Sequence, residues 1–122
     1  VLTVVLSGNH SKISQIVNRL RSQGVLPVSL LIAATRHFKI LFSIASNPEG
    51  PSLGAAALRP PIYGPRKENL INQAQKWGPE KIKNAIKSIT ATNLQLRSQN
   101  QKLPQMALVE RLFIRLAMTL NN

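Results

Sequence analysis

The residues with the clearest chemical meaning lie between Arg59 and Lys87, where basic side chains are interleaved with aromatic ones. Basic groups neutralise phosphates and release counterions, while an aromatic face stacks on an unpaired base. This stretch therefore predicts contact with nucleic acid. Its basic residues are Arg59, Arg66, Lys67, Lys76, Lys81, Lys83 and Lys87, and its aromatic residues are Tyr63 and Trp77.

The two aromatic residues differ in what their positions predict. Trp77 stands at the end of an amphipathic stretch, where a large ring is more often buried in the core or packed against a helix end. Tyr63 lies between Pro61 and Gly64 in a loop stiffened by proline. For Tyr63, a binding role and simple anchoring of the loop stay open as alternatives.

The sequence contains no set of side chains suited to catalysis. His10 and His37 have no acidic residue nearby in sequence to orient the ring, and metal-ligand spacing is missing. There is no aspartate, so paired carboxylates would have to come from four scattered glutamates. The glycines at 50, 54 and 64 match neither a phosphate-binding loop nor a dinucleotide fingerprint. We expect no catalytic site, no cofactor and no metal in this chain.

The charge balance points to a polyanionic partner. Sixteen lysines and arginines face four glutamates, which gives a formal net charge of +12. Such an excess produces a long-range positive field that attracts nucleic acid or an anionic membrane surface. The alternative is a generally basic surface that only keeps the protein soluble.

Other features of the composition concern compartment and chain boundaries. Cysteine is absent, which excludes disulfides and thiolate metal sites and fits a reducing cytoplasm. No apolar run approaches the roughly 20 residues of a membrane-spanning helix, so we expect no membrane association. The chain starts without Met inside an apolar stretch, so we expect a C-terminal fragment of a longer protein.

Apolar residues at helical spacing predict about five helices in a single domain, residues 1–122. Ser11 is expected to cap the first clear helix, which ends at Gly24, and Pro27 to start a long buried helix that runs to Ser46. Further helices are expected over 66–76, from Pro79 to about 98, and from Pro104 to 120. Residues 1–6 could form a strand or the tail of a helix. We therefore expect an all-α bundle of about five helices.

One long segment is too rich in proline and glycine for a continuous helix. Residues 47–65 contain five prolines and three glycines. Leu53, the apolar run 55–58 and Ile62 are expected to anchor it, so we expect a loop packed on the domain rather than a free linker.

Taken in order, these features resemble the C-terminal, collar-forming domain of the delta subunit of the bacterial DNA polymerase III clamp loader. The resemblance runs nearly from end to end. It includes residues 59–67, in which the Pro-Pro-aromatic-Gly-Pro-Arg loop is the most specific motif. Other matching segments are 7–8, 24–28, 30–31, 36–38, 73–74, Trp77 and 104–112.

The resemblance implies a collar-like helical bundle that assembles with other clamp-loader subunits in DNA replication, in the bacterial cytoplasm. It implies that the collar lies over primer-template DNA, with Tyr63 blocking or stacking on a strand end and with Arg66 and Lys67 holding phosphate. Arg59 is a further candidate DNA-binding residue. Contact with the sliding clamp would belong to an N-terminal portion missing here, and polymerase activity to the whole holoenzyme.

Further positions follow from the resemblance with less specific roles. Leu94 and Arg97 are typical pattern positions, expected to pack. Apolar helix faces, including Leu108 and Ile114 off the main stripe, are expected to meet neighbouring subunits. Some relatives carry a second aromatic after the fourth helix, where this chain has Asn100, Gln101 and Lys102.

A rival interpretation is a free-standing basic helical module that binds nucleic acid through the helix at 80–98. Sequence readout would need a recognition helix whose side chains reach base edges. The face with Lys81, Lys83 and Lys87 lacks an Arg or Asn cluster, which favours phosphate contact over readout.

Overall fold

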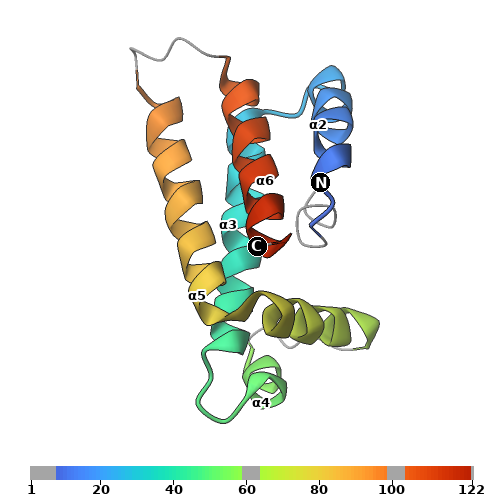
Figure 1. Ribbon diagram of the computed structural model, residues 1–122, viewed down its shortest axis with the longest axis vertical. Coiled ribbons are helices and arrows are strands. Elements are labelled where there is room, and N and C mark those ends of the chain that lie inside the picture. Colours follow the sequence, from blue (N-terminus) through green and yellow to red (C-terminus); the bar gives the residue numbers. More distant parts are fainter. Residues whose placement is uncertain (1–7, 59–63, 99–103, 122) are drawn as a thin grey trace. The chain divides into compact units, whose positions relative to one another are not determined.

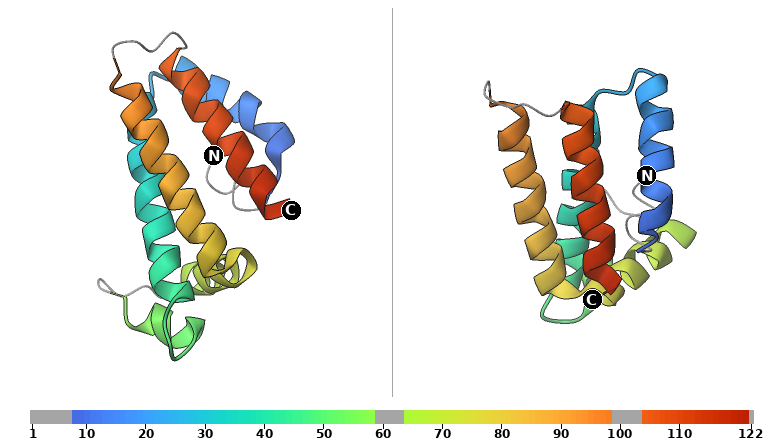
Figure 2. Two further views of the ribbon diagram at one scale, coloured as in Figure 1. Left: turned by 60° about the vertical axis from the view of Figure 1, so that its left-hand side comes forward. Right: turned by 45° about the horizontal axis from the view of Figure 1, so that its top comes forward.

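The computed structural model describes residues 8–58, 64–98 and 104–121 (Figures 1 and 2). Across these ranges the chain forms five α-helices and one 3-10 turn, with no strand. The elements are η1 (His10–Lys12), α2 (Ile13–Ser22), α3 (Pro27–Ala45), α4 (Pro51–Ala56), α5 (Pro65–Leu96) and α6 (Gln105–Asn121). The predicted all-α fold is confirmed. Residues 1–6, predicted as strand or helix, lie outside the described ranges.

The two ends of α2 show where local sequence signals succeed and fail. At its end, Gly24 has φ 84°, and the Val25 N–H donates to the Leu20 carbonyl oxygen at 3.0 Å. This is the glycine-terminated cap in which a left-handed residue lets the chain satisfy the last carbonyls. At its start, the Ser11 hydroxyl donates to Asn9 Oδ1 at 2.9 Å, and no side chain caps the helix. The prediction of Ser11 as the cap was therefore wrong.

The segment predicted as an irregular loop contains a helix, α4, so the prediction of a loop over 47–65 was wrong for residues 51–56. Pro51 stands in its first turn, where the missing N–H has no intrahelical partner to lose. Ala55 is buried, as expected of an anchor, whereas Leu53 is 52% exposed and is not one. Ile62 lies outside the described residues.

A break divides α5 at the position that the sequence predicts. Gly78 has φ 78° and ψ 157°, a backbone conformation essentially restricted to glycine, and Pro79 follows it. The helix therefore consists of two segments, one on each side of Gly78.

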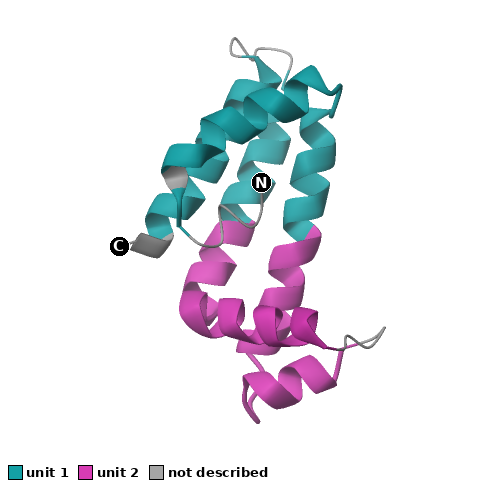
Figure 3. Cartoon of the chain, turned by 90° about the vertical axis from the view of Figure 1, so that its right-hand side faces the viewer, with its two compact units in different colours: residues 1–35, 87–122 teal, residues 36–86 magenta. Residues whose placement is uncertain are grey.

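The chain divides into two compact units, coloured separately in Figure 3. Unit 1 comprises residues 1–35 and 87–122, and unit 2 comprises residues 36–86. The prediction of a single domain stays a prediction. The helices α3 and α5 each contribute one part to each unit.

In unit 1, α6 packs against α2 on one side and lies beside the C-terminal part of α5 on the other (Figures 1 and 2). The Gln105 side-chain amide donates to the Leu96 carbonyl oxygen at 3.1 Å, which ties the start of α6 to the end of α5. The largest fully buried side chains of this unit are Ile13, Val17, Leu31, Ile89, Val109, Leu112 and Phe113.

In unit 2, the segment of α5 before Gly78 runs crosswise to residues 79–86 of the same helix, and α4 lies near the first of these segments (Figure 3). The core of this unit is formed by side chains of α3, α4 and α5, namely Phe38, Leu41, Ile44, Ala55, Leu70, Ile71, Ala74, Trp77, Ile82 and Ala85. These residues recur at the 3-4 spacing of amphipathic helices.

By length and composition, α3 is also able to cross a membrane, with 19 residues and a mean hydropathy of 1.5 in its most apolar window. The sequence analysis looked for uninterrupted apolar runs and did not find this helix, because Arg36 and Lys39 interrupt the run. These two charges still leave the mean hydropathy of the window high. The finding is weak evidence for a membrane, since core helices meet the same criterion. Leu31, Phe38 and Leu41 are at most 1% exposed, but only 33% of the apolar window is buried.

Candidate nucleic-acid interface

The structure describes two of the four residues predicted to bind DNA. Arg66 is exposed and Lys67 is half-buried, and both belong to the first turn of α5. Gly64, with φ 71°, precedes this turn and accepts a hydrogen bond from the Lys67 N–H at 3.1 Å. The other two predicted residues, Arg59 and Tyr63, lie outside the described residues, so the stacking role of Tyr63 stays a prediction.

Trp77 is buried and cannot stack on a base. Its side chain is 3% exposed, and its ring meets that of Phe38 edge to face, with centroids 5.3 Å apart and planes at 77°. Aromatic pairs favour this geometry because the positive edge of one ring meets the negative face of the other. The expected burial of Trp77 is confirmed.

His37 has a structural contact next to this aromatic pair. Its Nε2–H donates to the Gln73 side-chain oxygen at 2.9 Å, and both residues are partly buried. The bond joins α3 to the first segment of α5 within unit 2. Across the described residues, no group of three or more His, Cys, Asp or Glu side chains could hold a metal ion.

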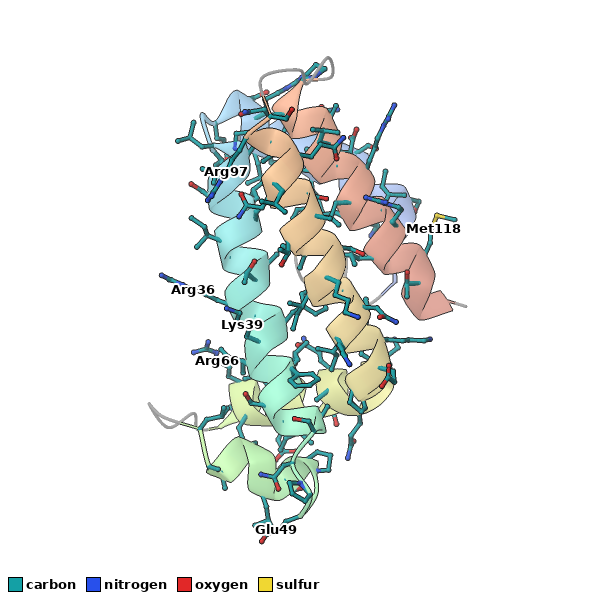
Figure 4. All side chains as sticks on the ribbon, turned by 90° about the vertical axis from the view of Figure 1, so that its left-hand side faces the viewer. Arg36, Lys39, Glu49, Arg66, Arg97 and Met118 are labelled. Carbon is teal, nitrogen blue, oxygen red and sulfur yellow. The ribbon has the colours of Figure 1, made fainter. Side chains whose placement is uncertain are left out.

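The structure adds two basic residues that the prediction omitted. Arg36 and Lys39, three residues apart on α3, are exposed. Figure 4 shows Arg36, Lys39 and Arg66 following one another along the same edge of unit 2. We call these three residues the α3–α5 basic edge.

A sequence signal for Arg36 and Lys39 existed. They are the only basic residues within α3, a helix that is otherwise apolar or weakly polar, and helical residues three apart share a face. Core helices place their charges on the solvent side, so this pair could have been assigned to the surface. That Arg66 follows this pair along the same edge could not have been assigned, because 26 residues lie between Lys39 and Arg66 in sequence.

The basic edge can neutralise phosphates and position a nucleic-acid backbone. Unit 2 contains eight basic residues and three glutamates, so the surplus that the composition shows is present within this unit. At the first turn of α5 the helix dipole adds to the attraction for anions, although Glu68 in the same turn opposes it. Such contacts hold a strand without reading its sequence.

The basic face of the helix at 80–98, which the rival interpretation favours, has two exposed lysines, one fewer than the three exposed cations of the α3–α5 basic edge. Lys83 and Lys87 are exposed and Lys81 is half-buried, while Glu80 is exposed as well. Lys83 belongs to unit 2 and Lys87 to unit 1.

Two residues expected to pack do not do so within the described part of the chain. Leu94 is 64% exposed, and Arg97 is exposed too, so the packing expected of both was wrong. In contrast, Leu108 is only 6% exposed and Ile114 is half-buried. Whether Leu108 and Ile114 meet neighbouring subunits stays a prediction.

Comparisons of the chain with models of known protein families, with curated proteins and with solved structures find no match.

Proposed function

We propose that this chain is a helical assembly domain of a DNA-replication clamp loader, similar to the collar domain of the bacterial delta subunit, and that it contacts primer-template DNA through the α3–α5 basic edge and the adjoining loop. The all-α bundle agrees with this proposal, and the order of motifs along the chain suggests it. The domain supplies assembly and DNA contact and no catalytic step of its own.

The observation that carries the proposal is the succession of Arg36, Lys39 and Arg66 along one edge in the view of Figure 4. Arg66 belongs to the loop motif within residues 59–67, the most specific piece of the resemblance. Cations from α3 therefore extend the positive surface around Arg66, which the resemblance expects to hold phosphate. A phosphate backbone can follow such an edge, since each cation in contact neutralises one charge.

Exposed apolar side chains in unit 1 support the assembly part of the proposal. Val28 and Ile32, four residues apart on α3, are 41% and 47% exposed, and Leu94 on α5 is 64% exposed. Leaving large apolar groups in water costs free energy that contact with a partner would recover. These residues are candidates for contact with neighbouring subunits.

Fluorescence anisotropy of a labelled primer-template junction, titrated with the 122-residue chain at several salt concentrations, tests DNA contact. We expect the Arg36→Ala, Lys39→Ala double variant to lower the salt dependence, the slope of log K against log salt, by about 2, since each lost phosphate contact removes about 0.9. An Arg66→Ala, Lys67→Ala variant and a Tyr63→Ala variant test the loop.

The control is Lys12→Ala, Arg19→Ala, which removes the same charge from exposed positions of unit 1. It should keep the wild-type slope. If the control lowers the salt slope as much as the unit 2 variants do, the effect depends only on net charge and the proposed DNA contact is wrong. The free-standing module would be favoured by two results together. DNA binding would be lost only in the Lys81→Ala, Lys83→Ala variant, and the wild-type chain would bind plain duplex as well as it binds the junction.

A further inference from the structure

A groove in unit 1 has a chemical character different from that of the basic edge. It lies between the C-terminal part of α5 and α6, and it encloses about 460 Å³. We call it the α5–α6 groove, and its lining residues are Thr92, Gln95, Leu108, Arg111, Ile114 and Arg115. All six belong to unit 1.

The groove combines a basic rim with a floor of two apolar residues, Leu108 and Ile114, and the buried Thr92. Leu108 and Thr92 are 6% and 3% exposed, and Ile114 is half-buried. Arg111 and Arg115 are exposed and four residues apart on α6, so they stand one above the other on the same edge. None of the lining residues is acidic, and unit 1 as a whole has one glutamate, Glu110, against eight basic residues.

The length of the groove suits a helix. Its α6 side extends from Leu108 to Arg115, which at 1.5 Å per residue is about 10 Å, or two helical turns. An amphipathic helix places apolar side chains over such a distance at positions i, i+3 or i+4, and i+7. A phosphate backbone would gain nothing from the apolar floor, because its contacts are made by cations and hydrogen-bond donors.

We propose that the α5–α6 groove binds an amphipathic helix of a partner protein, with the partner's leucine-type side chains on Leu108 and Ile114 and its carboxylates facing Arg111 and Arg115. Charge complementarity of this kind orients a partner and speeds encounter. The inference rests on the assembly part of the proposed function, in which Leu108 and Ile114 are expected to meet neighbouring subunits, and it adds the chemistry of the partner. It is independent of DNA contact, whose described residues belong to the other unit.

The probe for the test is a fluorescein-labelled synthetic peptide of about four helical turns, with leucines at 3-4 spacing flanked by glutamates. Anisotropy is measured while the 122-residue chain is added. We expect saturable binding that weakens about tenfold in Arg111→Glu, Arg115→Glu, and several-fold in Ile114→Gln. A second peptide with glutamine at every glutamate position should bind the wild-type chain more weakly than the acidic peptide does. The loss should be smaller than in the arginine variant, because the neutral peptide loses attraction without meeting like charges.

The matched control is Lys12→Glu, Arg19→Glu, which makes the same charge change in unit 1 outside the groove. It should bind the acidic peptide as the wild-type chain does, and circular dichroism confirms that each variant is folded. Equal weakening in the control would overturn the proposal, because only net charge would then matter. So would unchanged binding in both groove variants, or full displacement of the peptide by a single-stranded oligonucleotide whose own binding also needs Ile114.

Discussion

At Gly54, replacement by alanine should destabilise the protein, although the same replacement normally stabilises a helix. Gly54 lies inside α4, and in a helix interior alanine is normally more favourable than glycine by about 1 kcal/mol. A Cβ at position 54 would, however, stand 2.8 Å from the Ile44 carbonyl oxygen, and 3.0 Å from both Ile44 Cα and Asn47 Cβ. Two of these atoms are backbone, so relief requires α4 to move away from the end of α3.

The magnitude follows from the two opposing terms. Overpacking costs about 1–3 kcal/mol, and three contacts this short place Gly54→Ala in the upper part of that range. After the gain of about 1 kcal/mol in helix propensity, we expect a net loss of about 1–2 kcal/mol. With a urea dependence of about 1–2 kcal/mol per molar, the midpoint should fall by about 1 M.

Trp77 makes the assay specific for the relevant unit. It is the single tryptophan of the chain, it is buried, and it belongs to unit 2 together with Gly54. Urea unfolding followed by tryptophan fluorescence therefore reports this unit. The control is Ser52→Ala at an exposed position of the same helix, expected to change stability by less than about 0.5 kcal/mol. A Gly54→Ala midpoint equal to or above that of the wild type would refute the steric argument.

Three further stability changes can be read by the same titration. Gly78→Ala should cost about 1–3 kcal/mol from backbone strain alone, because φ is 78° and nothing lies within 4 Å of the added Cβ; an unchanged midpoint would contradict the break in α5. Phe38→Ala should cost about 3–5 kcal/mol, since the ring is fully buried against Trp77, and a loss below about 1 kcal/mol would argue against that packing. Gln73→Ala leaves the His37 Nε2–H without its acceptor and should cost about 1 kcal/mol, whereas Gln73→Glu, which keeps an acceptor, should cost less.

The helical segments could be predicted from the sequence because their signals act over a few residues. Gly24 and Pro27 mark the end of one helix and the start of the next, and the structure has both where predicted. The exception is α4, whose six residues lie among the prolines and glycines of the predicted loop. A helix this short has little propensity of its own, and burial of Ala55 together with the close approach of Gly54 to Ile44 holds it.

The candidate interface was only partly predictable. Arg66 and Lys67 follow from a local motif, and the burial of Trp77 follows from its size and its place at the end of a helix. Arg36 and Lys39 were not among the predicted residues, because no local pattern tells which distant segment lies beside a given helix face. For the same reason, Leu94 matched a packed pattern in sequence although it is exposed in the structure.

The sequence alone determined the all-α class, the helix breaks at Gly24 and Gly78, and the strongly basic charge, since helical periodicity, backbone sterics and composition are properties of neighbouring residues or of the whole chain. Only the tertiary structure decided which cations share a surface and that Arg111 and Arg115 border an apolar groove. These depend on how helices pack, and packing is determined by shape complementarity between side chains far apart in sequence.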